Sequence, residues 1–360
     1  MMYGEMTMSS RIVLRDHPSD FNSMPNQSKG VNFDAFLDCI LEGDCRDVLR
    51  KLPDDCIDLI VTSPPYADRR NHTYGGIKPD RYVDWFIPIA NELKRVLKPS
   101  GSFILNIKEI AVNGERHTYV IELILAMRNE GWKWTEEYIW HKKNCYPGKW
   151  PNRFRDAWER CLHFTRQKQF AMYQEAVRVP MGDWRHARLR NLSETDKRRD
   201  TSRVMSGFGK KIENWVGREW AYPTNVLHMA TECSNKGHSA TFPVSLPSWF
   251  IRLFTEPGGI VLDPFMGSGT TAIACQQTCR HFVGIEMNGE YCEAARKKLR
   301  GSEGPTLFDY LQENESDGNG STGRIDSTVP RPLLPETYRG VGQVEPEESA
   351  TSQESISVSR

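Results

Sequence analysis

Two short stretches carry residues whose types and spacing could do chemistry. The first, Ser63-Pro64-Pro65-Tyr66, directly follows an apolar run at 57–62. Two consecutive prolines fix φ and remove two backbone donors, so a strand at 57–62 has to end there. The second stretch, 259–271, joins an apolar strand to an acidic strand end and a glycine-rich turn. Both stretches therefore place polar groups where a predicted strand ends.

The glycine-rich turn has the composition of a ligand cradle. Gly267 and Gly269 let the backbone approach a ligand and adopt positive φ, and the threonines at 270–271 can cap the following helix. Glu286 ends the next apolar strand, 23 residues after Asp263. A carboxylate at such a strand end can accept hydrogen bonds from a ribose.

The same loop is a poor match to phosphate sites. No Gly-Lys-Ser/Thr follows the turn, and the G-x-G-x-x-G spacing of a dinucleotide site is absent. Asp263 would also repel a pyrophosphate. An acidic strand end instead favours a cationic nucleoside without phosphates, such as S-adenosylmethionine. A purely structural glycine turn is the alternative interpretation.

The two stretches, SPPY and DPFMGSGTT, together resemble the motifs of amino-methyltransferases that modify DNA bases at an exocyclic nitrogen. The catalytic motif precedes the cofactor motif, which is similar to the permuted class called β. The resemblance covers about 36–143 and 235–300. It implies an α/β, Rossmann-like methyltransferase fold with a doubly wound, mostly parallel seven-stranded sheet. It also implies S-adenosyl-L-methionine as the cofactor.

The resemblance assigns roles residue by residue. It implies catalysis by Ser63, Pro64, Pro65 and Tyr66. Asp44 resembles the family's Gly-Asp strand end, and 238–243 resembles its His-x-Ala-x-Phe-Pro element. The implied cofactor-binding residues are Asp44, Phe242, Pro243, Asp263, Pro264, Phe265, Gly267, Ser268, Gly269, Thr270 and Glu286.

The catalytic motif suits methyl transfer to an amino nitrogen, whose lone pair is delocalised into the base. Accepting hydrogen bonds from both N–H groups would aim that lone pair at a sulfonium methyl group. Ser63 Oγ can accept one bond, and the Pro64 carbonyl, held by Pro65, can accept the other. Tyr66 offers a ring face to a flipped base. No Pro-Cys dipeptide occurs, so methylation of cytosine carbon 5 is not indicated.

The target base is the least determined point. Neutral Ser63 in place of aspartate makes the resemblance favour N4 of cytosine over N6 of adenine, and its hydroxyl can also donate to cytosine N3. The sequence therefore leaves three alternatives open: a cytosine-N4 DNA methyltransferase, an adenine-N6 DNA methyltransferase, and a DNA-binding protein that has lost catalytic turnover. RNA or protein-amide substrates are disfavoured, because such enzymes usually place the cofactor loop before the catalytic motif.

The charged residues are unevenly distributed although the net charge is zero. Residues 141–220 carry 19 Lys and Arg against 9 Asp and Glu, while 301–360 carry 4 against 11. A basic middle segment suits a polyanion. By family analogy the basic insert at about 145–230 would be the target-recognition region for double-stranded DNA, and a cognate restriction endonuclease would be a functional partner. The candidate DNA contacts are Arg69, Arg70, Arg153, Arg155, Arg185, Arg188 and Arg190.

Strand and helix patterns alternate on both sides of the basic segment and predict a parallel α/β sheet. The predicted strands are 36–41, 57–62, 102–107, 132–141, 259–263 and 281–286, with a turn at 99–101. The predicted helices are 45–51, 82–97, 119–130, 245–255, 270–278 and 290–299. The predicted divisions are a disordered segment 1–33, a catalytic half 34–144, a target-recognition insert 145–234, a cofactor-binding half 235–300 and a disordered acidic tail 301–360.

Composition places the chain among reduced intracellular proteins. It has 360 residues, of which 38% are hydrophobic, and no apolar run of the ~18 residues that span a bilayer. Its nine cysteines include no Cys-x-x-Cys pair, and Cys275 and Cys279 are interpreted as buried thiols rather than metal ligands. We expect a cytoplasmic, nucleoid-associated protein without structural zinc.

Overall fold

Eight strands among the described residues form one sheet. The computed structural model describes residues 12–16, 33–68, 76–145, 152–181, 219–231 and 242–301. The strand order is β1-β12-β11-β2-β3-β7-β6-β10, and β7 runs antiparallel to both of its neighbours while the other pairs are parallel. The strands are β1 (Cys39–Glu42), β2 (Ile57–Thr62), β3 (Leu97–Ile107), β6 (Lys133–Lys142), β7 (Trp158–Thr165), β10 (Val226–Met229), β11 (Ile260–Asp263) and β12 (His281–Glu286).

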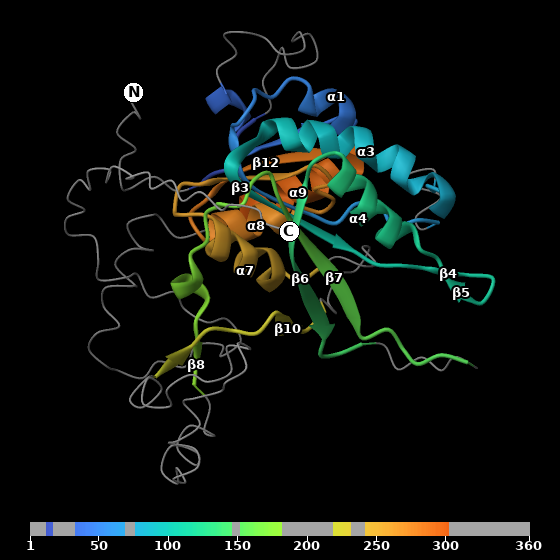
Figure 1. Cartoon of the computed structure of the whole chain (residues 1–360). Coiled ribbons are helices and arrows are strands. Elements are labelled where there is room, and N and C mark those ends of the chain that lie inside the picture. Colours follow the sequence, from blue (N-terminus) through green and yellow to red (C-terminus); the bar gives the residue numbers. More distant parts are fainter. Residues whose placement is uncertain are drawn as a thin grey trace, which may run out of the picture.

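Helices cover both faces of this sheet (Figure 1). One face carries α1 (Cys45–Leu49), α3 (Pro79–Val96) and α4 (Tyr119–Asn129), and the other carries α7 (Ser245–Phe254), α8 (Thr270–Gln277) and α9 (Gly289–Gly301). Strand residues alternate between the two cores: Ile60 packs with the first helix layer, and Leu59 and Val61 with the second. The predicted doubly wound α/β fold is confirmed, with β10 as an additional edge strand.

Short elements complete the described chain. They are the 3₁₀ helices η2 (Phe33–Phe36) and η3 (Gln174–Val177), the pair β4 (Ala111–Val112) and β5 (Glu115–Arg116), and the pair β8 (Val179–Pro180) and β9 (Trp220–Ala221). Within the described ranges, no helix has both the length and the apolar character needed to cross a membrane. Cys275 and Cys279 are both buried, as expected.

The strand order reverses between β11 and β2. From β11 the sheet continues through β12 to β1, and from β2 it continues to β3. In open α/β sheets, ligands bind in the crevice outside the carboxyl ends of the strands at such a reversal. The loop that begins at Ser63 follows β2, and the glycine-rich turn follows β11. The fold therefore brings the two motifs together from distant parts of the chain.

Two local expectations were wrong. The predicted turn at 99–101 lies inside β3, where a register shift in the pairing with β2, between Ile57 and Leu59, accompanies the exposed Pro99 and Ser100. The N-terminal segment predicted to be disordered includes the described residues 12–16. Ile12 is buried there, and its carbonyl accepts a hydrogen bond of 3.2 Å from Gln276 Nε2.

The segment predicted as a target-recognition insert contributes two strands to the sheet. β7 pairs between β3 and β6, and β10 forms the edge beside β6. Most residues of β7 are buried, so its sequence lacks the alternation of a half-exposed strand. That part of 145–234 forms a separate target-recognition region stays a prediction. It now concerns the residues between β7 and β10. The acidic tail after 301 lies outside the described residues.

Candidate active site

A cavity of about 1260 Å³ lies at the reversal of strand order, and both motifs line it. Pockets for single small molecules are usually ~300–1000 Å³, so this cavity has room for a cofactor and a second group. Its wall includes these predicted residues: Ser63, Pro64, Pro65, Tyr66, Asp44, Phe242, Asp263, Pro264, Phe265, Gly267, Ser268, Thr270, Glu286, Arg153 and Arg155. Pro243 and Gly269 are not part of the wall. Arg69, Arg70, Arg185, Arg188 and Arg190 lie outside the described residues.

Asp263 ties the two loops together. Its Oδ1 accepts hydrogen bonds from Thr62 Oγ1 at 2.6 Å and from the Phe265 amide at 3.1 Å, and its Oδ2 accepts one from Thr271 Oγ1 at 2.6 Å. The residue is only 2% exposed, and burial raises the pKa of its carboxyl group from 3.8 to about 6 against the lowering effect of the threonine hydrogen bonds. The carboxylate predicted to favour a cation thus also bonds protein groups through both oxygens.

The glycine turn has the predicted backbone conformation. Gly267 and Gly269 have φ values of 55° and 86°, and a Cβ added at Gly269 would lie 2.9 Å from Cβ of Ala295 on α9. Gly269 is itself the N-cap of α8, which has no side-chain cap. The prediction that a threonine caps this helix is therefore wrong, because Thr271 donates to Asp263 instead.

Ser268 provides an independent sign of a polar ligand. Its side chain is buried in the cavity wall, and its Oγ has no hydrogen-bond partner among the residues that the structure describes. Buried hydroxyl groups are normally paired in folded proteins. A bound molecule with a polar group beside the turn would satisfy this one.

Two further carboxylates stand at the ends of neighbouring strands. Glu286, at the end of β12, accepts the Gly267 and Asn288 amides, each at 2.8 Å. Asp44 follows β1 and caps α1 by accepting the Arg46 amide at 2.9 Å. The Arg46 guanidinium, 2.5 Å from Asp44 Oδ2, lowers the pKa of that carboxyl group below 3.8. Both carboxylates are therefore oriented by local donors while they line the cavity.

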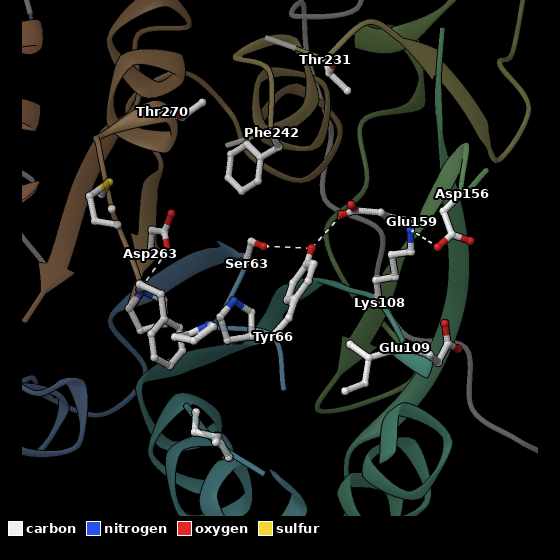
Figure 2. Close-up of a pocket in the computed structure, with 18 of the residues that line it drawn as sticks. Ser63, Tyr66, Lys108, Glu109, Asp156, Glu159, Thr231, Phe242, Asp263 and Thr270 are labelled. Atoms are coloured by element: carbon white, nitrogen blue, oxygen red, sulfur yellow. Dashed lines mark hydrogen bonds and ion pairs between the residues drawn. The ribbon is translucent and has the colours of Figure 1, made fainter. Parts of the chain in front are cut away.

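Tyr66 lies at the centre of a polar chain (Figure 2). Ser63 Oγ donates to Tyr66 Oη at 3.2 Å, and Tyr66 Oη donates to Glu159 Oε2 at 2.7 Å. Lys142 Nζ lies 2.5 Å from the other carboxylate oxygen of Glu159. Sequence analysis missed Glu159 and Lys142. Both belong to the cavity wall. Glu159 lies on β7, a strand that the sequence did not reveal, and Lys142 ends β6, a strand that was predicted to end one residue earlier.

A basic rim borders the cavity next to the β4–β5 hairpin. Arg153 Nη2 donates to the Gly114 carbonyl at 2.5 Å, and Lys108 and Arg116 both pair with Asp156, at 3.0 and 2.9 Å. Between Arg153 and Arg155, the ring of Phe154 is 98% exposed. Cations beside an exposed ring suit contact with nucleic acid.

Replacing Asp263 by asparagine should remove one pH-dependent part of the stability. A folded-state pKa of about 6, above the ordinary 3.8, means that the folded protein binds this proton more tightly than the unfolded chain. Stability contributed by this group is therefore present below pH ~4 and falls as the pH rises to ~6. A pKa difference of this size corresponds to about 3 kcal/mol.

Urea unfolding of wild type and Asp263→Asn at several pH values tests this. The free energy of unfolding of the variant should rise relative to wild type between pH ~4 and ~6 and then level off. Asp84→Asn, at an exposed carboxylate on α3, is the control and should show no such trend. A pH-independent difference between Asp263→Asn and wild type would contradict the raised pKa.

Comparisons with known proteins agree with this geometry. Residues 57–297 match the N6/N4 methyltransferase family model, described as DNA methylase. The chain is 30% identical over 298 residues to the Type II methyltransferase M.PvuII of Proteus hauseri (76% of this chain, 87% of that protein). It is 28% identical over 298 residues to the Type II methyltransferase M.Cfr9I of Citrobacter freundii (73% and 88%). The solved structure of PvuII DNA methyltransferase (cytosine-N4-specific) has the same fold, with a TM-score of 0.53 at 24% identity over 76% of this chain and 91% of that one. The chain belongs to the N6/N4 DNA methylase family.

Proposed function

We propose that this protein is a site-specific DNA methyltransferase that transfers a methyl group from S-adenosyl-L-methionine to the exocyclic N4 of cytosine in duplex DNA. The observation that carries the proposal is that the SPPY loop and the glycine turn line one cavity and are joined by the Thr62–Asp263 hydrogen bond of 2.6 Å. A methyl donor at one loop and an acceptor at the other would thus be held in fixed relative positions.

The residues of the wall fit the proposed cofactor. When bound, S-adenosyl-L-methionine supplies an electrophilic methyl group on a sulfonium. Glu286 would accept hydrogen bonds from the ribose, and Asp44 would accept from the adenine. The Ser268 hydroxyl, which has no partner among the described residues, supports a polar ligand beside the turn, and the positive φ of Gly267 keeps the backbone open to it. Phe242 would cover the methionine end.

The catalytic loop is held rigidly enough to receive a flipped base. Tyr82 Oη donates to the Pro65 carbonyl at 3.0 Å, and Glu159 fixes the Tyr66 hydroxyl at 2.7 Å. The Tyr66 ring would then act as a stationary stacking surface. Ser63 Oγ and the Pro64 carbonyl would accept hydrogen bonds from the amino group.

Two observations support cytosine, and the curated relatives support a restriction–modification context. Ser63 is a neutral acceptor, and a solved structure with the same fold is of a cytosine-N4-specific enzyme. The curated relatives reported above are Type II methyltransferases, so we infer that the protein is the modification half of such a pair. The rim around Arg153 and Arg155 supports duplex DNA as the substrate. Arg69, Arg70, Arg185, Arg188 and Arg190 stay proposed contacts.

The modified nucleoside should be N4-methylcytosine. The protein is incubated with duplex DNA of diverse sequence and methyl-labelled S-adenosylmethionine, and the digested DNA is analysed by mass spectrometry. N6-methyladenine would overturn the choice of cytosine. DNA without label, from protein that binds the cofactor, would overturn the proposed activity.

Ser63→Ala should lower the single-turnover methylation rate by about 100-fold, since one of two acceptors for the amino group is lost. The dissociation constant for the cofactor should stay within about twofold of wild type, because Ser63 does not belong to the glycine turn. Ser100→Ala changes an exposed serine of β3 that is not part of the cavity wall, and it should methylate at the wild-type rate. Equal rates for Ser63→Ala and wild type would refute the role of Ser63.

DNA modified by the protein should resist a restriction endonuclease. Sequencing that detects modified bases first maps the methylated sequence, and the DNA is then challenged with an endonuclease that cleaves that sequence. Methylation at many unrelated sequences, or cleavage at the wild-type rate after full methylation, would argue against the restriction–modification role.

A further inference from the structure

Figure 2 shows the hydrogen bonds that join Ser63, Tyr66 and Glu159, and their donors and acceptors follow from the chemistry of these groups. An ionised carboxylate only accepts, so Tyr66 must give its single hydrogen to Glu159. The oxygen of Tyr66 can then only accept, and it accepts from Ser63 Oγ at 3.2 Å. The hydrogen of Ser63 is thereby turned toward Tyr66, and the lone pairs of its oxygen are available to an amino group in the cavity.

We propose that Glu159 is the positioning residue that makes Ser63 an acceptor and that it receives, through Tyr66, the proton released by methyl transfer. This inference rests on the proposed function and deepens it. In this arrangement Ser63 accepts from the amino group of the base rather than donating to its ring nitrogen.

The proton balance follows the same path. Transfer forms a bond between the amino nitrogen and the methyl carbon and breaks the carbon–sulfur bond, whose electron pair stays on sulfur. The nitrogen becomes positive and gives one proton to Ser63 Oγ, as Ser63 gives its own to Tyr66 Oη and Tyr66 gives its own to Glu159 Oε2. The product amine is neutral, and protonated Glu159 loses its proton to water after the products leave. No oxidant or reductant is needed.

The surroundings of Glu159 suit this role. The residue is 7% exposed, and a buried carboxylate is costly unless it is paired and hydrogen-bonded. Lys142 provides the countercharge at 2.5 Å from Oε1, which leaves Oε2 to Tyr66. Glu159 and Lys142 are both part of the cavity wall.

Tyr66 and Asn106 support the same direction. Burial, and then the charge of Glu159, raises the pKa of Tyr66 well above 10, so the phenol can pass a proton on without becoming an anion. Asn106 Nδ2 donates to the Arg160 carbonyl at 3.1 Å, which turns its Oδ1 to Tyr66 Oη at 3.2 Å. Both groups beyond the phenol are therefore acceptors.

The test uses the full chain and a duplex that carries the sequence mapped as methylated. Glu159→Gln keeps the shape of the side chain but removes its charge, and it should lower the single-turnover rate at saturating cofactor and DNA by about 100-fold. KM for DNA and the dissociation constant for the cofactor should stay within about twofold. Tyr66→Phe should have a similar effect on the rate. The double variant should be no slower than the slower single variant, because both changes interrupt one chain.

Glu137→Gln is the matched control. Glu137 on β6 pairs with Arg160 on β7, so this change also removes an ion pair between the same two strands, but Glu137 is not part of the cavity wall. Its rate should equal that of wild type. Formate should partly restore the rate of Glu159→Ala and leave that of Glu137→Ala unchanged.

Any of three results would overturn the assignment. The first is a wild-type methylation rate for Glu159→Gln, and the second is a double variant whose loss of rate is the product of the two single losses. The third is a loss of rate in Glu137→Gln as large as that in Glu159→Gln. If Glu159→Gln does not fold, Tyr66→Phe decides, and an unchanged rate there overturns the proposal. A wild-type protein that labels no DNA is a different outcome, because it refutes the proposed function itself.

Discussion

The buried carboxylate of Asp263 is the interaction on which the geometry of the site depends. It joins Thr62, at the end of β2, to the glycine turn and to Thr271 on α8, across 201 residues of sequence. Burying this group is costly, as its pKa of about 6 indicates. The hydrogen bonds of this carboxylate fix the offset between the two loops, that is, their positions relative to each other. In-line transfer needs aligned reacting atoms, and a misplacement of about 1 Å can cost about 100-fold in rate, so such an offset matters more than the strength of either hydrogen bond.

The order of strands then arranges the remaining groups in a row. Four polar residues lie at the ends of strands that are consecutive neighbours in the sheet: Glu286 and Asp263 end β12 and β11, and Asp44 and Ser63 come just after β1 and β2. Adjacent strands lie ~4.8 Å apart, so the row is roughly 14 Å long. An elongated ligand lying across the strand ends would meet an acceptor for adenine first, then one for ribose, then the turn. Ser63, the proposed hydrogen-bond acceptor for the amino group that receives the methyl, stands at the far end of the same row.

Local chemistry made much of this predictable from sequence. The double proline permits few backbone conformations, and the glycines at 267 and 269 allow the positive φ that the turn uses, so the end of β2 and the turn were predicted correctly. The hydrogen-bond partners of the polar side chains were not predictable from local sequence, because they depend on the tertiary structure. Thr271 was expected to cap a helix, but a carboxylate eight residues earlier takes its hydroxyl hydrogen. Glu159 meets Tyr66 from 93 residues away, on a strand too buried to show alternation.

The reversal of β7 explains why Glu159 lies at this edge of the sheet. Parallel strands present their last residues here, as β3 does at Ile107 and β6 at Lys142, but an antiparallel strand presents its first. Glu159 is the second residue of β7, and a parallel strand would have placed Thr165 at this edge instead. The arginines of the basic rim, 153 and 155, immediately precede the same strand. Arg155 lies four residues before Glu159, so one short stretch of chain carries both the cations of the rim and the carboxylate behind Tyr66.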